Sequence, residues 1–178
     1  MDDPANRETQ RARVRAELET ARQEFHAMAG ALSARAWVEP SHNPGWTNGQ
    51  LLFHVMLGFI LVPPLARLLV WFGRLPGVWS RTFAGVLDVA TPVFNRVNAL
   101  GPRAGARLLG KAGVVRRFDR VHARILARLD RIRPGDWSLT MPYPTRWDPR
   151  FRSDMRLENL FRYPIDHLRH HRAQLRAP

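Results

Sequence analysis

The sequence contains no cysteine. Disulfide bonds, thiolate metal ligands and a cysteine nucleophile are therefore excluded, and any metal site must use histidine or carboxylate side chains. Lysine is almost absent too: Lys111 is the only lysine among 28 basic residues, so arginine carries the net charge of +13. The N-terminal stretch MDDPANRETQRARVR is polar and lacks the apolar core of a secretory signal. We therefore expect a cytoplasmic location.

The strong positive charge raises the question of a nucleic-acid partner, because basic surfaces attract phosphate whatever the base sequence. The arginines are spread along the whole chain and do not gather in one segment. No helix-turn-helix, zinc-finger or RNP-like pattern is present. A preference for arginine over lysine is also typical of GC-rich coding sequences. Nucleic acid is therefore not the partner that we expect.

The length and the hydrophobic pattern predict one all-α domain spanning residues 1–178. A chain of 178 residues with 45% hydrophobic residues can build one full core. Apolar residues recur every three or four positions in four segments, at about 6–32, 47–72, 114–132 and 153–175. Between the second and third segments, residues 74–113 are rich in glycine and proline, which predicts a long, partly helical connection. The expected architecture is a four-helix bundle with this insertion.

The second predicted helix has the clearest start. Thr47 followed by Gln50 three residues later is the pattern of a capping box. Pro63 and Pro64 lack the amide donor that a helix needs, so they are expected to kink or end it. A second proline, Pro164, is expected to kink the last helix in the same way.

The apolar segment 51–72 also approaches the roughly 20 residues that span a bilayer. His54, Arg67 and the Pro63–Pro64 pair lie inside it, and charged residues are rare and costly within membranes. A buried core helix is the favoured interpretation. Insertion into a membrane, or peripheral contact with one, stays open as the alternative.

Histidines form the most suggestive cluster. His167 and His171 are four residues apart and share one face of the last helix, whereas His170 points away from that face. Two imidazoles make an incomplete site, because catalytic zinc usually takes three protein ligands. His54, among the apolar residues of the second helix, is the obvious third donor, or else a hydrogen-bonded core histidine. We expect the other three, His26, His42 and His122, to be surface or flank residues, with an approach of His42 or His122 to the site left open. We expect the six tryptophans to pack in the core or at the ends of the bundle, where one of them could line the pocket.

A helix beginning WTNGQLLFHV, followed after a long gap by HLRHHRAQL, resembles the DinB family of four-helix bundles. In that family an early histidine of the second helix and an H-x-x-x-H pair of the last helix bind a divalent metal. The resemblance implies that His54, His167 and His171 are the metal ligands. It implies zinc as the expected ion, with nickel or iron as alternatives.

The same resemblance implies a metal-dependent enzyme with a small-molecule substrate. DinB-like proteins of known activity include S-transferases and isomerases that use a low-molecular-weight thiol such as bacillithiol, mycothiol or glutathione, and metal-dependent hydrolases. No catalytic residue is identifiable from the sequence, since Glu17, Glu24 and Asp166 are candidates for a general base by type alone. The alternative functions are a metal-binding bundle without catalysis and a membrane-associated basic bundle. The apolar insertion would also suit a homodimer.

Overall fold

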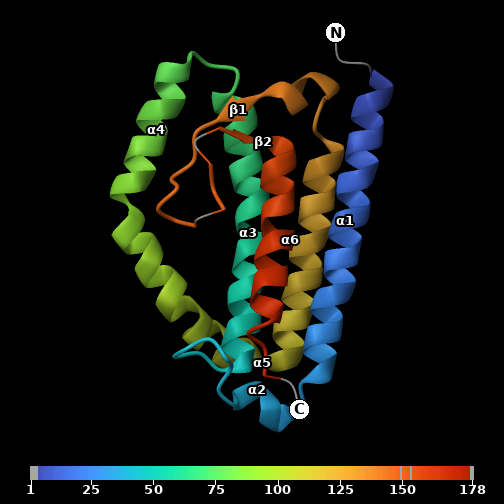
Figure 1. Cartoon of the computed structure of the whole chain (residues 1–178), viewed down its shortest axis with the longest axis vertical. Helices are drawn as coiled ribbons and strands as arrows, with labels where there is room; N and C mark the ends of the chain where they lie inside the picture. The colour runs from blue at the N-terminus through green and yellow to red at the C-terminus, as the bar shows by residue number, and fades with distance from the viewer. Residues whose placement is uncertain (1–3, 149, 153, 177–178) are drawn as a thin grey trace.

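A computed structural model describes residues 4–148, 150–152 and 154–176. Four long helical segments lie side by side as a bundle (Figure 1). They are α1 (Pro4–Ala31), α3 (Asn48–Phe72), the second half of α5 (Thr91–Asp130) and α6 (Leu157–Arg172). Helices α5 and α6 each contact both α1 and α3, which closes the bundle into a ring. The prediction of an all-α bundle is therefore confirmed.

Aromatic residues connect three of these helices at the centre of the core. The ring of Phe118 on α5 stacks on that of Phe25 on α1, with the ring centres 3.8 Å apart. The ring of Phe59 on α3 meets Phe118 edge-on at 4.9 Å. All three side chains are fully buried, so each contributes about 1.5–3 kcal/mol through removal from water. This packing fixes α3 relative to its neighbours.

Helix α3 starts at the predicted cap and ends close to the predicted residue 72. The Thr47 hydroxyl accepts from the Gln50 amide, and the Gln50 side chain accepts from the Thr47 amide, so the capping box is present. The helix then continues through Pro63 and Pro64 to Phe72, so the prolines do not end it and it fills the predicted segment 47–72. Packing against α5 and α6 holds the helical path, and α6 likewise continues through Pro164.

The length and composition of α3 alone would allow it to cross a membrane. Half of its most apolar stretch is buried inside the protein, where it contacts α5 and α6. The buried half of this stretch belongs to the core of the bundle, as expected for a core helix.

The predicted insertion is more regular than its glycines and prolines suggested. It forms α4 (Gly77–Val89) and the first half of α5, which together make a bowed arm beside the bundle (Figure 1). We call residues 77–109 the arm. At Gly110 the backbone has φ 60° and ψ 178°, a conformation accessible almost only to glycine, and there the chain turns from the arm into the bundle. The predicted helix 114–132 is thus the second half of α5.

Short elements complete the chain where the sequence suggested loops. These are α2 (Ala34–Val38), a 3₁₀ turn (Pro134–Ser138), and a two-stranded hairpin of β1 (Thr140–Met141) with β2 (Met155–Arg156). Because of the hairpin, α6 begins at Leu157 and not at 153. The loop after β1 reaches the arm, where Trp147 stacks on Phe94 at 4.2 Å. This contact brings the next residue, Asp148, to the candidate site.

Candidate metal centre

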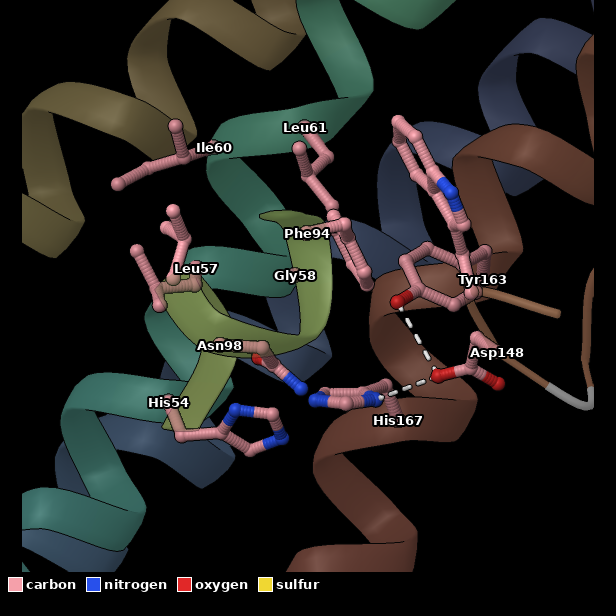
Figure 2. A pocket seen from close by; sticks show the side chains of 12 residues that line it. His54, Leu57, Gly58, Ile60, Leu61, Phe94, Asn98, Asp148, Tyr163 and His167 are labelled. Carbon is pink, nitrogen blue, oxygen red and sulfur yellow. Dashed lines mark hydrogen bonds and ion pairs between the residues drawn. The ribbon is translucent and has the colours of Figure 1, made fainter. Parts of the chain in front are cut away.

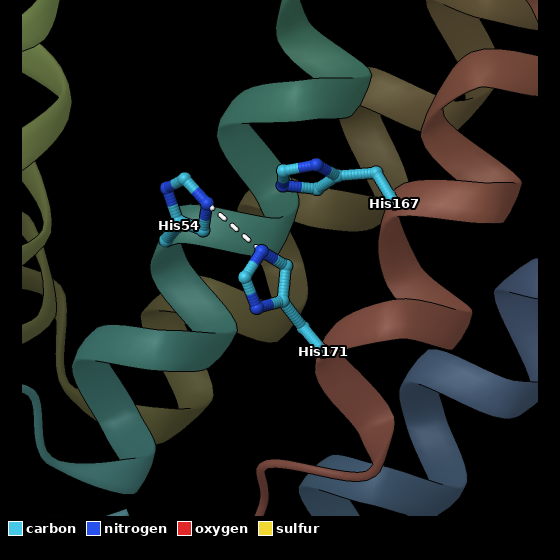
Figure 3. A group of neighbouring side chains, drawn as sticks. All are labelled: His54, His167 and His171. Carbon is cyan, nitrogen blue, oxygen red and sulfur yellow. Dashed lines mark hydrogen bonds between the residues drawn. The ribbon is translucent and has the colours of Figure 1, made fainter. Parts of the chain in front are cut away.

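His54 of α3 and the pair His167 and His171 of α6 point toward one another (Figure 3). The Nε2 atoms of His54 and His171 are 3.1 Å apart, and one ring nitrogen from each of the three histidines lies within 4.8 Å of the others. All three side chains are buried. The structure therefore brings together the three residues that the sequence singled out.

These spacings suit a common ion. Two nitrogens bound to one zinc at 2.0–2.1 Å with a tetrahedral angle lie about 3.3 Å apart. The separation between His54 and His171 is already close to that value. Because the three nitrogens together span up to 4.8 Å, ligation by all three requires the His167 ring to rotate toward the other two.

Two neighbours orient the imidazoles of α6. The side-chain amide oxygen of Gln174, Oε1, lies 2.7 Å from Nδ1 of His171. This contact favours a proton on Nδ1 and leaves the lone pair of Nε2 facing His54. Oδ2 of Asp148 lies 3.4 Å from Nδ1 of His167 and favours the same tautomer there. Both ring nitrogens of His167 and Nδ1 of His54 are buried and make no hydrogen bond in the described part of the chain, so the 3.4 Å approach of Asp148 to His167 is a contact between charged or polar groups and not a hydrogen bond. Buried nitrogens without a partner are costly in an apolar core, and a bound ion would satisfy Nε2 of His167.

The environment keeps the rings of His54 and His171 neutral. Burial, followed by the proximity of His167 and His171, lowers the pKa of His54 to about 3. Burial and the neighbouring His167 also lower the pKa of His171 to about 4. Neutral imidazole is the form that binds metal, so both rings are in the ligating form at neutral pH. Although burial alone would raise it, the neighbouring His167 ring and a hydrogen bond from the Arg150 amide lower the pKa of Asp148 to about 2, so its carboxylate is charged.

A cavity of about 270 Å³ adjoins the histidines. Its polar groups gather at one end, where His54, Asn98, His167 and Asp148 lie close together, while aliphatic and aromatic side chains form the rest of the wall (Figure 2). The apolar part is lined by Leu57, Ile60, Leu61, Phe94, Val97 and Trp147. Helix α3, helix α6, the arm and the loop after β1 all contribute to this wall. The cavity can therefore hold a small molecule with an apolar body and a polar head at the imidazoles.

Gly58 explains how the His167 ring fits beside α3. A Cβ atom at position 58 would lie 3.1 Å from Cδ2 of His167, closer than an ordinary van der Waals contact. A residue with a side chain there would have to displace the ring. The glycine one turn after His54 is thus part of the geometry of the site.

The acidic candidates chosen by residue type lie elsewhere. Glu17 forms a bidentate pair with Arg162, Glu24 pairs with Arg169, and Asp166 is exposed on α6. None of the three lines the cavity. His170 is exposed, as its place on the helix indicated.

Sequence reasoning missed Asp148, Asn98 and Gln174 as members of the site. Gln174 follows His171 by three residues, so helical spacing was a usable signal for it. Asp148 and Asn98 stand in the loop after β1 and in the arm, and they approach the histidines only through the tertiary fold.

One expectation for the other histidines was wrong. His122 is buried, not on the surface, and Nε2 of its ring lies 3.2 Å from the Leu18 carbonyl oxygen, so it is a core histidine outside the cluster. Among the tryptophans, Trp37 and Trp137 are buried, Trp147 lines the cavity, and Trp71 and Trp79 are each 60% exposed.

Comparison with known proteins gives one match. The family model of the DinB superfamily matches residues 17–175, which include all three histidines. No curated protein and no solved structure matches the chain.

Proposed function

The chain belongs to the DinB superfamily, and from this premise we propose that it is a metal-dependent enzyme that acts on a small apolar molecule. His54, His167 and His171 would hold a divalent ion, with zinc as the expected metal and nickel or iron as alternatives. The reaction would be a thiol-dependent S-transfer or isomerisation, or a hydrolysis. One observation carries the proposal: three buried imidazoles from two helices converge, and two of them, His54 and His167, line the polar end of an otherwise apolar cavity.

The donor set fits such an ion. Three neutral imidazoles leave the full charge of the metal uncompensated, and borderline-soft zinc, nickel and iron all accept imidazole nitrogen. Three protein ligands also leave a position for water or substrate, as in catalytic zinc sites. When bound, the ion would lower the pKa of a coordinated thiol or water and so supply a nucleophile at neutral pH.

The residues of the chain would position the reacting groups. Asp148 and Gln174 hold the rings of His167 and His171 in the tautomer that presents Nε2. The apolar wall excludes water from the rest of the cavity, which strengthens the interaction of the site with a developing charge. Because the chain has no cysteine, the sulfur of a thiol reaction must come from a small-molecule thiol.

Metal content and turnover test the proposal separately. Protein purified without an affinity tag is analysed for bound metals, and about one equivalent of ion per chain is expected. The metal-loaded protein is then tested for consumption of bacillithiol, mycothiol or glutathione with small aromatic electrophiles, and for hydrolysis of small apolar esters and amides. A chelated sample is the control, and its activity should return when the metal is added back.

Three outcomes are distinct. Metal-dependent turnover supports the whole proposal. Stoichiometric metal with no turnover of any of these substrates would leave a metal-binding protein without catalysis, and the enzymatic part would be wrong. A protein that binds no divalent ion would contradict the assignment of the three histidines as ligands.

A further inference from the structure

The arm, residues 77–109, presents large apolar side chains to solvent. Val89 and Leu108 are each 82% exposed, Val93 is 67% exposed, and Trp79 at the start of α4 is 60% exposed. Its fully buried positions carry small residues instead, namely Ser80, Ala84, Pro102 and Ala106. Phe83 and Phe94 face inward but are only half-buried. A helix that covers a soluble core usually turns most of its large apolar residues inward, whereas the arm leaves the majority of its own on the outside.

The exposed apolar residues of the arm form stripes. On a helical wheel at about 100° per residue, one set on α5 falls within about 80° of arc. This set is Val93, Val97, Leu100, Ala104 and Leu108, all exposed. On α4, Val78, Val86 and Val89 likewise share one side within about 80°. On each half of the arm, an outward apolar stripe is thus exposed by half or more at each of its valines and leucines, although Val97 also borders the cavity.

Positive charge flanks the stripe on α5. Arg96, Arg103 and Arg107 fall within about 40° of one another on the wheel, beside the apolar stripe, and all are exposed. On α4, the exposed Arg81 likewise lies beside the apolar stripe. The only acidic residue between Glu39 and Asp119 is Asp88, which is half-buried. The outer side of the arm therefore combines apolar and cationic groups.

We propose that the arm is a docking surface for an anionic lipid bilayer. Helices with an apolar side, flanking arginines and an exposed tryptophan lie at the membrane interface, where the apolar side enters the acyl region and the arginines meet lipid phosphates. A second copy of the chain fits less well, because pairing two arms would bring arginines of the same sign together. Nucleic acid fits less well too, because apolar groups occupy the middle of the surface.

The docking surface adjoins the cavity of the candidate metal centre. Val97 belongs to the exposed stripe and also lines that cavity, and Phe94 and Asn98 line it from the same helical turns. An apolar molecule dissolved in a bilayer would therefore have a short path to the histidines. The docking itself needs no metal, so it is tested independently of the proposed activity.

The test is co-sedimentation of the full chain with lipid vesicles. Vesicles of equal parts phosphatidylcholine and phosphatidylglycerol should retain the protein, whereas vesicles of phosphatidylcholine alone should retain much less. Binding should weaken as salt is raised, because the arginine contribution is screened. Val89→Asp and Leu108→Asp should each weaken binding at least about tenfold, since each removes one apolar contact and adds a negative charge. Both positions are so exposed that the variants should fold.

The matched control is Val38→Asp, because Val38 is 66% exposed but lies at the end of α2, outside the arm. This variant should bind vesicles like the wild type. Arg96→Gln and Arg107→Gln should each weaken binding to anionic vesicles about fivefold. Metal removal by a chelator should leave binding unchanged.

Three results would overturn the proposal. The first is that anionic and neutral vesicles retain the same amount of protein, or that neither retains any. The second is equal loss of binding in Val38→Asp and Val89→Asp. The third is a stable dimer in analytical ultracentrifugation that Val89→Asp and Leu108→Asp dissociate, which would assign the surface to a second copy of the chain.

Discussion

Oδ2 of Asp148 lies 3.4 Å from Nδ1 of His167, which joins the loop after β1 to the last helix of the bundle. The same carboxylate oxygen accepts a hydrogen bond of 3.3 Å from the Tyr163 hydroxyl, one turn before His167. The Arg150 amide donates to its other oxygen at 2.8 Å. Three partners from two segments therefore fix the carboxylate behind the ring of a candidate metal ligand.

Asp148→Asn should weaken metal binding by about 10–100-fold, the usual effect of removing a partner that orients a ligating histidine. The asparagine keeps the size of the side chain but loses the charge that favours the ligating tautomer. Competition with a chromophoric chelator would measure the change in dissociation constant. Asp166→Asn is the control, because Asp166 is exposed on the same helix and does not line the cavity. Equal affinities of the two variants would contradict a positioning role for Asp148.

The two neighbouring histidines of α6 should differ sharply. His171→Ala should lose the bound ion, since the ring of His171 is buried against His54. His170→Ala should keep it, because His170 is exposed. Elemental analysis of both variants after gel filtration would compare metal per chain. If both variants retain the same amount of metal, His171 is not a ligand.

Much of the site could be predicted because its signals are local. The spacing of His167 and His171 places them on one face of a helix in any fold, and the Thr47 capping box fixes where the helix carrying His54 begins. That His54 meets the pair depends on α3 and α6 being neighbours, which the family resemblance implied and the helix contacts confirm.

Other features of the fold and the site could not be predicted, because contacts between elements far apart in the sequence determine them. The continuation of α3 through Pro63 and Pro64 depends on neighbours that hold the helix on both sides. The place of Asp148 depends on a two-residue hairpin and on the stacking of Trp147 against Phe94, and neither leaves a periodic signal in the sequence. The burial of His122 depends on a carbonyl of α1, at Leu18.

Metal-free protein should lose stability on mild acidification. The pKa values of His54 and His171 in the folded chain, about 3 and about 4, lie below the ordinary value of 6.5. Below about pH 6.5 the unfolded chain therefore binds two protons that the folded chain excludes. The free energy of unfolding should fall as the pH decreases from 6.5 toward 4, by about 2.7 kcal/mol per pH unit at most. The lowered pKa of Asp148, about 2, acts in the same direction only below about pH 4.

Urea unfolding of chelator-treated protein at several pH values from 7 to 4.5 would measure this dependence. The double variant His54→Gln/His171→Gln should show a much flatter dependence over that range, because its two rings no longer titrate. His170→Gln, at an exposed position, should behave like the wild type. If the double variant and the wild type lost stability in parallel, protonation of His54 and His171 would not be the cause of the pH dependence.

Alanine substitutions at two glycines of the insertion, Gly110 and Gly85, should change the stability of the protein in opposite directions. At Gly110, φ is +60° and ψ is 178°, and a Cβ would meet no atom within 4 Å, so the cost of Gly110→Ala is backbone strain alone. That strain is about 1–3 kcal/mol. Gly85 also has open space around a Cβ but lies inside helix α4, so Gly85→Ala should stabilise by about 0.5–1 kcal/mol.

Chemical denaturation of the two variants beside the wild type would test this contrast. Because the added methyl group is the same and neither site is crowded, opposite signs would establish that the turn from the arm into the bundle depends on the backbone of Gly110. Destabilisation at Gly110 should also alter the arm, which supplies Phe94 and Val97 to the cavity. Stabilisation by Gly110→Ala would mean that α5 runs straight through this position, and the arm would then lie elsewhere.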